Sequence, residues 1–134
     1  MIRCVGAVVH DERGRLLLVL RAHRPDAGRW SLPGGRVEAG ETDATALSRE
    51  MVEETGLEVV PEALCGTVTR SRDGVVYDIH DYVCRVVGGR IMAGDDAAAV
   101  DWIDRATFVT LNERDELTSG LADTLHGWNV LPRE

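Results

Sequence analysis

The sequence contains no lysine, and this absence limits what the protein can bind. All 15 basic residues other than histidine are arginines, and the 23 acidic residues leave a formal net charge of −8 at pH 7. This charge disfavours a nucleic acid polymer as a partner, because a polyanion-binding surface needs clustered positive charge. A small anionic substrate is compatible with it, since a bound metal ion would supply positive charge locally.

Cysteine is scarce, and long apolar runs are absent. Cys4, Cys65 and Cys84 are far apart and outside any CxxC motif, so we expect three reduced thiols. His80 and Cys84 could instead share a strand face as a zinc pair, although no further ligands stand nearby. The apolar run 4–9 is too short for a secretory signal, and no stretch is long enough to span a membrane. We therefore expect a cytoplasmic protein without membrane contact.

Low-complexity tracts and linker-like segments are also absent from the 134 residues. Hydrophobic residues make up 44% of the chain, which argues against disorder and is sufficient for a substantial core. We expect one folded domain over residues 1–134.

A helix over residues 42–55 is the best-defined element that we predict. This segment contains no proline or glycine and is rich in alanine, leucine, methionine and glutamate. Thr42 suits the N-cap position, and Gly56 suits the C-terminal stop.

Three carboxylates of this helix, Glu50, Glu53 and Glu54, share about one turn. Glu54 also borders the apolar stripe of the helix. The predicted stripe consists of Ala44, Leu47 and Met51. Like charges at this spacing cost roughly 0.2–0.5 kcal/mol per pair on an exposed helix, and more beside a core. A hard divalent cation would neutralise them, whereas the alternative is an ordinary solvated helix face.

The stretch around this helix resembles the signature of the Nudix hydrolases. The fixed positions that match are Gly35, Glu41, Arg49, Glu50, Glu53, Glu54 and Gly56, followed by the aliphatic Leu57. Such identities would coincide at a given register with a probability on the order of 10⁻⁹ to 10⁻⁸. The order of elements alone predicts only a mixed α and β protein. The resemblance implies an α/β (α+β) fold, namely an α/β/α sandwich with a mixed β-sheet and a loop-helix-loop signature.

The resemblance also implies a reaction that depends on Mg²⁺, with Mn²⁺ as the other suitable ion. The pyrophosphate bond of a nucleoside diphosphate linked to another moiety would be hydrolysed by attack of an activated water, without a covalent intermediate. By the family pattern, Glu50, Glu54 and the Gly34 carbonyl would hold the metal. Glu53 would act in catalysis beside them, and which carboxylate serves as base is left open.

Two further residues of the signature take supporting roles by the same resemblance. Arg49 would hold a catalytic glutamate through a charge-assisted hydrogen bond, and Glu41 would be its other partner. Gly34 and Gly35 let the backbone approach a ligand closely, although a turn is the alternative explanation for this pair.

Three candidates for substrate or metal contacts lie outside the signature. Arg21, after the aliphatic strand expected over 16–20, is a candidate for the substrate phosphates, with a surface ion pair as the alternative. Tyr77 could stack on a nucleobase or belong to the core or rim. Asp96, or failing that Asp95, would bind a second cation or act as base, unless it only shapes a turn.

The other expected elements follow from periodicity and turn residues. Residues 2–9 and 16–20 should form a hairpin, and Arg72–Gly74 should be the turn of a second one. A short strand is expected over 90–92. The last helix should run over 113–125, where leucines repeat every four residues.

Substrate and assembly are the least determined features. A nucleoside triphosphate is favoured by elimination, with ADP-ribose or a nucleotide sugar as alternatives. A non-catalytic nucleotide-sensing module on the same fold is a further alternative, disfavoured because every charged position of the signature is present. Trp128 and Leu131 either pack beneath the last helix or contribute to a homodimer contact.

Overall fold

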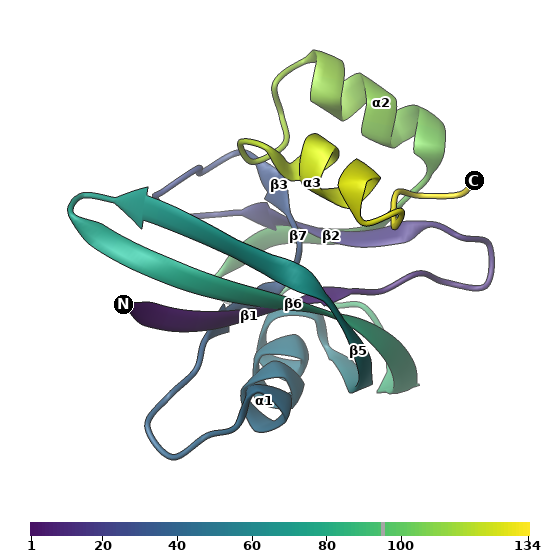
Figure 1. The fold of residues 1–134 in the computed structure, drawn as a ribbon. Helices are drawn as coiled ribbons and strands as arrows, with labels where there is room; N and C mark the ends of the chain where they lie inside the picture. Colours follow the sequence, from purple (N-terminus) through teal and green to yellow (C-terminus); the bar gives the residue numbers. More distant parts are fainter. Residues whose placement is uncertain (95) are drawn as a thin grey trace.

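Two β-sheets lie between α1 on one side and α2 and α3 on the other (Figure 1). The structure is a computed structural model that describes residues 1–94 and 96–134. This arrangement confirms the predicted α/β/α class, with its strands divided into two sheets. Within the described residues, no helix is long and apolar enough to cross a membrane.

The first sheet carries the order β4–β1–β6–β5 and is mixed. Its strands are β1 (Ile2–Val8), β4 (Gly34–Arg36), β5 (Leu57–Arg72) and β6 (Val75–Gly89). β1 runs parallel to β6 and antiparallel to β4. Asp73 and Gly74, both with positive φ, form the predicted turn between β5 and β6, and this long hairpin projects beyond the rest of the sheet (Figure 1).

The second sheet carries the order β3–β2–β7. Its strands are β2 (Leu16–Arg21), β3 (Trp30–Ser31) and β7 (Ala97–Ile103). The predicted hairpin of β1 with β2 is therefore wrong, since the two strands belong to different sheets and meet only near the bridge between His10 and Leu16. Both edges of β1 are already paired, with β4 and with β6, so β2 pairs elsewhere.

Helix α1 (Asp43–Thr55) has the predicted boundaries. The Thr42 side chain caps its first turn by accepting a hydrogen bond from the Thr45 N–H, and Gly56 ends it at φ 79°. Its buried residues are Ala46, Leu47, Met51 and Thr55, so the predicted stripe was wrong at Ala44, which is exposed.

The predicted helix over 113–125 is wrong. Helix α2 (Arg105–Glu113) ends where this segment begins, and helix α3 (Leu121–Gly127) covers only its last part. Between them the chain turns at Asp115 (φ 56°) and at Gly120 (φ 78°) and forms hydrogen bonds to Trp30. The repeated leucines still share one core cluster, although one comes from the loop and two come from α3. They are Leu117, Leu121 and Leu125. Residues 90–92 form no strand, contrary to expectation.

Candidate active site

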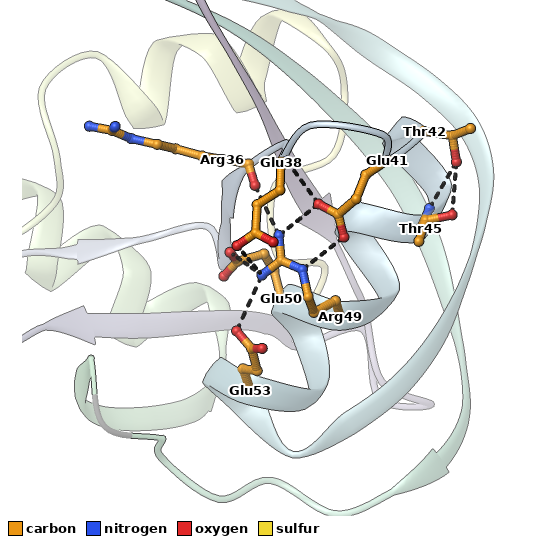
Figure 2. Close-up of polar contacts among 8 residues, drawn as sticks. All are labelled: Arg36, Glu38, Glu41, Thr42, Thr45, Arg49, Glu50 and Glu53. Atoms are coloured by element: carbon orange, nitrogen blue, oxygen red, sulfur yellow. Dashed lines mark hydrogen bonds and ion pairs between the residues drawn. The ribbon is translucent and has the colours of Figure 1, made fainter.

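Arg49 of α1 lies at the centre of a cluster of carboxylates (Figure 2). Its Nε and Nη2 donate to the two carboxylate oxygens of Glu41 at 2.8 and 2.9 Å. Its Nη1 donates to Glu50 at 2.9 Å and to Glu53 at 3.3 Å. The hydrogen bonds from Arg49 lower the pKa of Glu41 to about 2. One guanidinium thus holds three of the predicted acidic residues.

The loop before α1 is bound to the helix by the same arginine. Arg49 Nη2 donates to the Arg36 carbonyl at 3.1 Å, while the Arg36 side chain points away from the cluster (Figure 2). Glu41 accepts a further hydrogen bond from the Glu38 N–H at 2.8 Å. The signature therefore forms a loop followed by a helix. Their relative position depends on the ion pairs and hydrogen bonds of Arg49.

Glu50 and Glu54 face the two glycines of β4. The Gly34 N–H donates to Oε1 of Glu54 at 2.8 Å. A β-carbon at position 35 would lie 2.3 Å from Cδ of Glu50, so the Glu50 carboxylate fills the space that Gly35 leaves open. The sequence needs glycine here because any side chain would displace a carboxylate of the site.

The electrostatics of this pair reflect crowding of negative charge. Burial raises the pKa of Glu54 to about 7; Glu50 and Asp96 add to the rise, whereas the Gly34 hydrogen bond and Arg21 oppose it. Burial also raises the pKa of Glu50, against the hydrogen bond from Arg49. Both carboxylates are therefore destabilised as anions, and a nearby cation would relieve this.

Glu50 and Glu54 together fit a magnesium-type site. Across residues 1–94 and 96–134, no three histidine, cysteine or acidic side chains are grouped as a ready metal cage. Mg²⁺ does not require one, because it is usually bound by one or two carboxylates together with waters and substrate phosphates. The contact of Gly34 with Glu54 is made by its N–H, and a role for its carbonyl stays a prediction.

A cleft of about 520 Å³ extends from these glutamates between the two sheets. It brings together most of the site residues expected from the sequence: Arg21, Gly34, Gly35, Glu50, Glu54, Tyr77 and Asp96. The other three, Glu41, Arg49 and Glu53, do not line this cleft as far as the described residues define it. They lie behind Glu50, where Arg49 connects them, and 60% of the Glu53 side chain is exposed.

Arg21 and Tyr77 stand at different places along the cleft. Arg21 ends β2, and its Nε donates to the Pro25 carbonyl at 2.8 Å. The Tyr77 ring lies 5.6 Å from the Arg36 guanidinium, which also donates to its hydroxyl at 3.3 Å. One face of the tyrosine is thus covered by an arginine, which leaves less of the ring for a base.

Asp96, the acidic residue predicted to bind a second cation or act as base, lines the cleft. This residue is exposed in a turn at the cleft and close enough to Glu54 to raise its pKa. The alternative candidate, Asp95, lies outside the described residues.

Several polar residues of the cleft were not recognised as site residues from the sequence. They include Ser31, Arg70, Arg72 and Asp81. Alternation along β6 could have indicated Asp81, because it shares a strand face with Tyr77. No local sequence pattern marked Ser31, Arg70 and Arg72. They reach the cleft only through folding of the β5–β6 hairpin and of β3.

A family model for the NUDIX domain matches residues 2–125. The chain belongs to the NUDIX family. A MutT-like protein of Streptomyces ambofaciens is 38% identical over 99 residues, covering 74% of this NUDIX chain and 61% of its own length. An ADP-ribose pyrophosphatase of Methanocaldococcus jannaschii is 38% identical over 97 residues, covering 70% and 57%. The chain thus spans about three fifths of these curated relatives.

The NUDIX fold is supported by solved structures as well. The crystal structure of a MutT protein from Methanosarcina mazei Go1 has a TM-score of 0.82 and 25% identity, covering 96% of this chain and 92% of that chain.

Proposed function

We propose that this NUDIX domain is a hydrolase of the pyrophosphate bond in a nucleoside diphosphate linked to another moiety, with nucleoside triphosphates as the preferred class. The observation that carries the proposal is the placement of Glu50 and Glu54 against the two glycines of β4 at one end of a 520 Å³ cleft. That volume suits a nucleotide-sized ligand. The pyrophosphatase name of one relative supports the same reaction class.

Glu50 and Glu54 are the residues that would hold Mg²⁺ or Mn²⁺, with the Gly34 carbonyl and Asp96 as further ligands. When bound, such a cation supplies positive charge for the diphosphate and favours deprotonation of a water. Arg49 is a positioning residue, because it fixes Glu50 relative to Glu41 through charge-assisted hydrogen bonds.

Glu53 and Arg21 are the two residues that would act on the reacting groups. The Glu53 side chain is 60% exposed although it is bound to Arg49, and among the glutamates bound to Arg49 only Glu38 is more exposed. The Glu53 carboxylate is therefore accessible for accepting the proton of a water. Arg21 lines the cleft near Glu54 and supplies a guanidinium for a substrate phosphate, and Gly35 lines the same cleft. Tyr77 lines the same cleft and would contact the nucleoside.

A second substrate class is ADP-ribose or a nucleotide sugar, which the name of one relative favours. A module that senses nucleotides without cleaving them is the remaining alternative. The cytoplasmic location, the single domain and the homodimer expected from the sequence stay predictions.

A product-resolved screen of nucleotides, ADP-ribose and nucleotide sugars with Mg²⁺ or Mn²⁺ tests the proposal. We expect cleavage at a pyrophosphate bond, and a loss of turnover of about 100-fold or more in Glu54→Gln. Glu12→Gln is the matched control, because Glu12 is exposed in the turn after β1 and does not line the cleft. Absence of cleavage in the whole panel would contradict the proposal, and tight binding without cleavage would support the sensing module.

A further inference from the structure

A carboxyl group that the proposed chemistry does not use lies on the inner wall of the cleft. Asp81 of β6 is only 6% exposed and lines the cleft on the side away from α1. Among the described residues, its carboxylate has neither a hydrogen-bond partner nor an ion-pair partner. A carboxylate that has no partner within the protein and borders an open cleft is available to accept hydrogen bonds from a ligand.

The backbone places Asp81 in one row with the glycine that holds Glu54. Gly34 of β4 is paired with Gly6 of β1, and Gly6 is paired with Asp81 of β6. A β-carbon on Gly6 would lie 2.1 Å from Oδ1 of Asp81, so the carboxylate extends over the glycine. Two strand spacings separate Gly34 from Asp81, roughly 10 Å. A nucleoside whose phosphates lie near Glu54 can therefore place its base edge at Asp81.

A buried polar atom without a partner lines the same cleft from the other sheet. Ser31 of β3 is 8% exposed, and its Oγ has no hydrogen-bond partner among the described residues. Around these two groups the cleft is lined by apolar side chains. They are Val19, Val68, Ile79 and Leu121. Apolar side chains with a few placed polar groups are typical of a pocket for a small-molecule ligand, and a nucleobase is a ligand of this kind.

The charged neighbours of Asp81 are engaged elsewhere. Arg70 lowers the pKa of Asp81, but its guanidinium donates to the Ser119 carbonyl at 2.7 Å. His80 has the same effect, and its Nε2 lies 3.0 Å from Oδ2 of Asp78. Burial outweighs both and raises the pKa of Asp81 to about 6, so the group is an acceptor-only carboxylate at pH 8.

We propose that Asp81 is a specificity-determining residue that recognises a guanine-type base by accepting hydrogen bonds from its ring imino and exocyclic amino groups. This inference rests on the proposed function, which supplies a nucleotide as the substrate. It adds the identity of the base that the cleft recognises. A carboxylate presents two adjacent acceptors and therefore complements two adjacent N–H donors. Guanine has such an edge. Adenine and cytosine present a donor beside an acceptor, and uracil and thymine present one donor between two acceptors.

The test compares the wild type with Asp81→Asn at pH 8. An amide replaces one acceptor by a donor, so it matches xanthine, whose ring imino group stands beside a carbonyl. We expect kcat/KM for guanosine triphosphate to fall about 10- to 100-fold and kcat/KM for xanthosine triphosphate to rise. Asp78→Asn is the matched control, because Asp78 lies on the opposite face of the same strand, outside the cleft lining.

A binding measurement keeps the inference separate from the proposed function. Calorimetric titration with guanosine, xanthosine and adenosine monophosphates in EDTA requires no catalysis. We expect the wild type to prefer guanosine monophosphate and Asp81→Asn to shift its preference to xanthosine monophosphate. A wild type without preference for guanine overturns the inference, and so does an equal loss for all bases in Asp81→Asn. A wild type that cleaves nothing but still selects guanine would overturn only the proposed function.

Discussion

Replacing Glu54 by glutamine should stabilise the metal-free protein at alkaline pH. Burial raises the pKa of Glu54 from the ordinary 4.5 to about 7 in the folded chain. Below pH 4.5 the carboxyl is protonated in both the folded and unfolded states and costs nothing. As the pH rises from 4.5 to 7, the unfolded chain loses this proton while the folded chain retains it, so the free energy of unfolding falls.

The full cost is reached above pH 7 and is about 3 kcal/mol. Glutamine removes the ionisation but retains a carbonyl oxygen that can accept the Gly34 N–H. The free energy of unfolding of the variant should therefore exceed that of the wild type by less than about 1 kcal/mol at pH 5 and by about 3 kcal/mol at pH 8. Asp81 titrates in a similar range, but it is present in both proteins and cancels in the difference.

Urea unfolding in EDTA at a series of pH values measures this difference directly. Added MgCl₂ should stabilise the wild type at pH 8 more than the variant, because a cation binds the ionised carboxylate. Glu12→Gln is the matched control, because Glu12 is exposed and lies outside the cleft lining. A constant difference between wild type and Glu54→Gln across the pH range would refute the electrostatic account of this site.

Two further substitutions test the parts that position the glutamates. Arg49→Lys should lower kcat by about 10- to 100-fold while the far-UV circular dichroism is unchanged, because an ammonium cannot make the paired contact to Glu41 together with the contact to Glu50. Wild-type kcat in this variant would exclude a positioning role for the guanidinium. Thr42→Ala should reduce the free energy of unfolding by about 1 kcal/mol through loss of the N-cap hydrogen bond, as measured by urea unfolding. An unchanged midpoint would contradict the capping role.

Local chemistry was enough to predict helix α1. Thr42 and Gly56 mark the ends of α1 through a side-chain cap and a left-handed backbone, and both effects involve only neighbouring residues. The placement of Glu54 beside the apolar stripe follows from helical periodicity alone, and it explains why this carboxyl is mostly buried.

The errors arose where distant segments compete for the same partners. Local pattern suggested a hairpin of β1 and β2, but both edges of β1 are occupied by β4 and β6. Periodic leucines suggested a helix over 113–125, but hydrogen bonds to Trp30 hold the middle of this segment as a loop. In both cases tertiary pairing overrode the local preference.

The sequence by itself determined the family, the acidic helix and the glycines opposite it, because capping, periodicity and residue spacing act over a few positions. Only the tertiary structure decided which side chains share the cleft. Asp81 and Ser31 come from different sheets and are adjacent to the same space because β6 pairs with β1 and β3 pairs with β2. Burial of an unpaired carboxyl depends on every segment packed around it, and no local pattern along the chain contains that information.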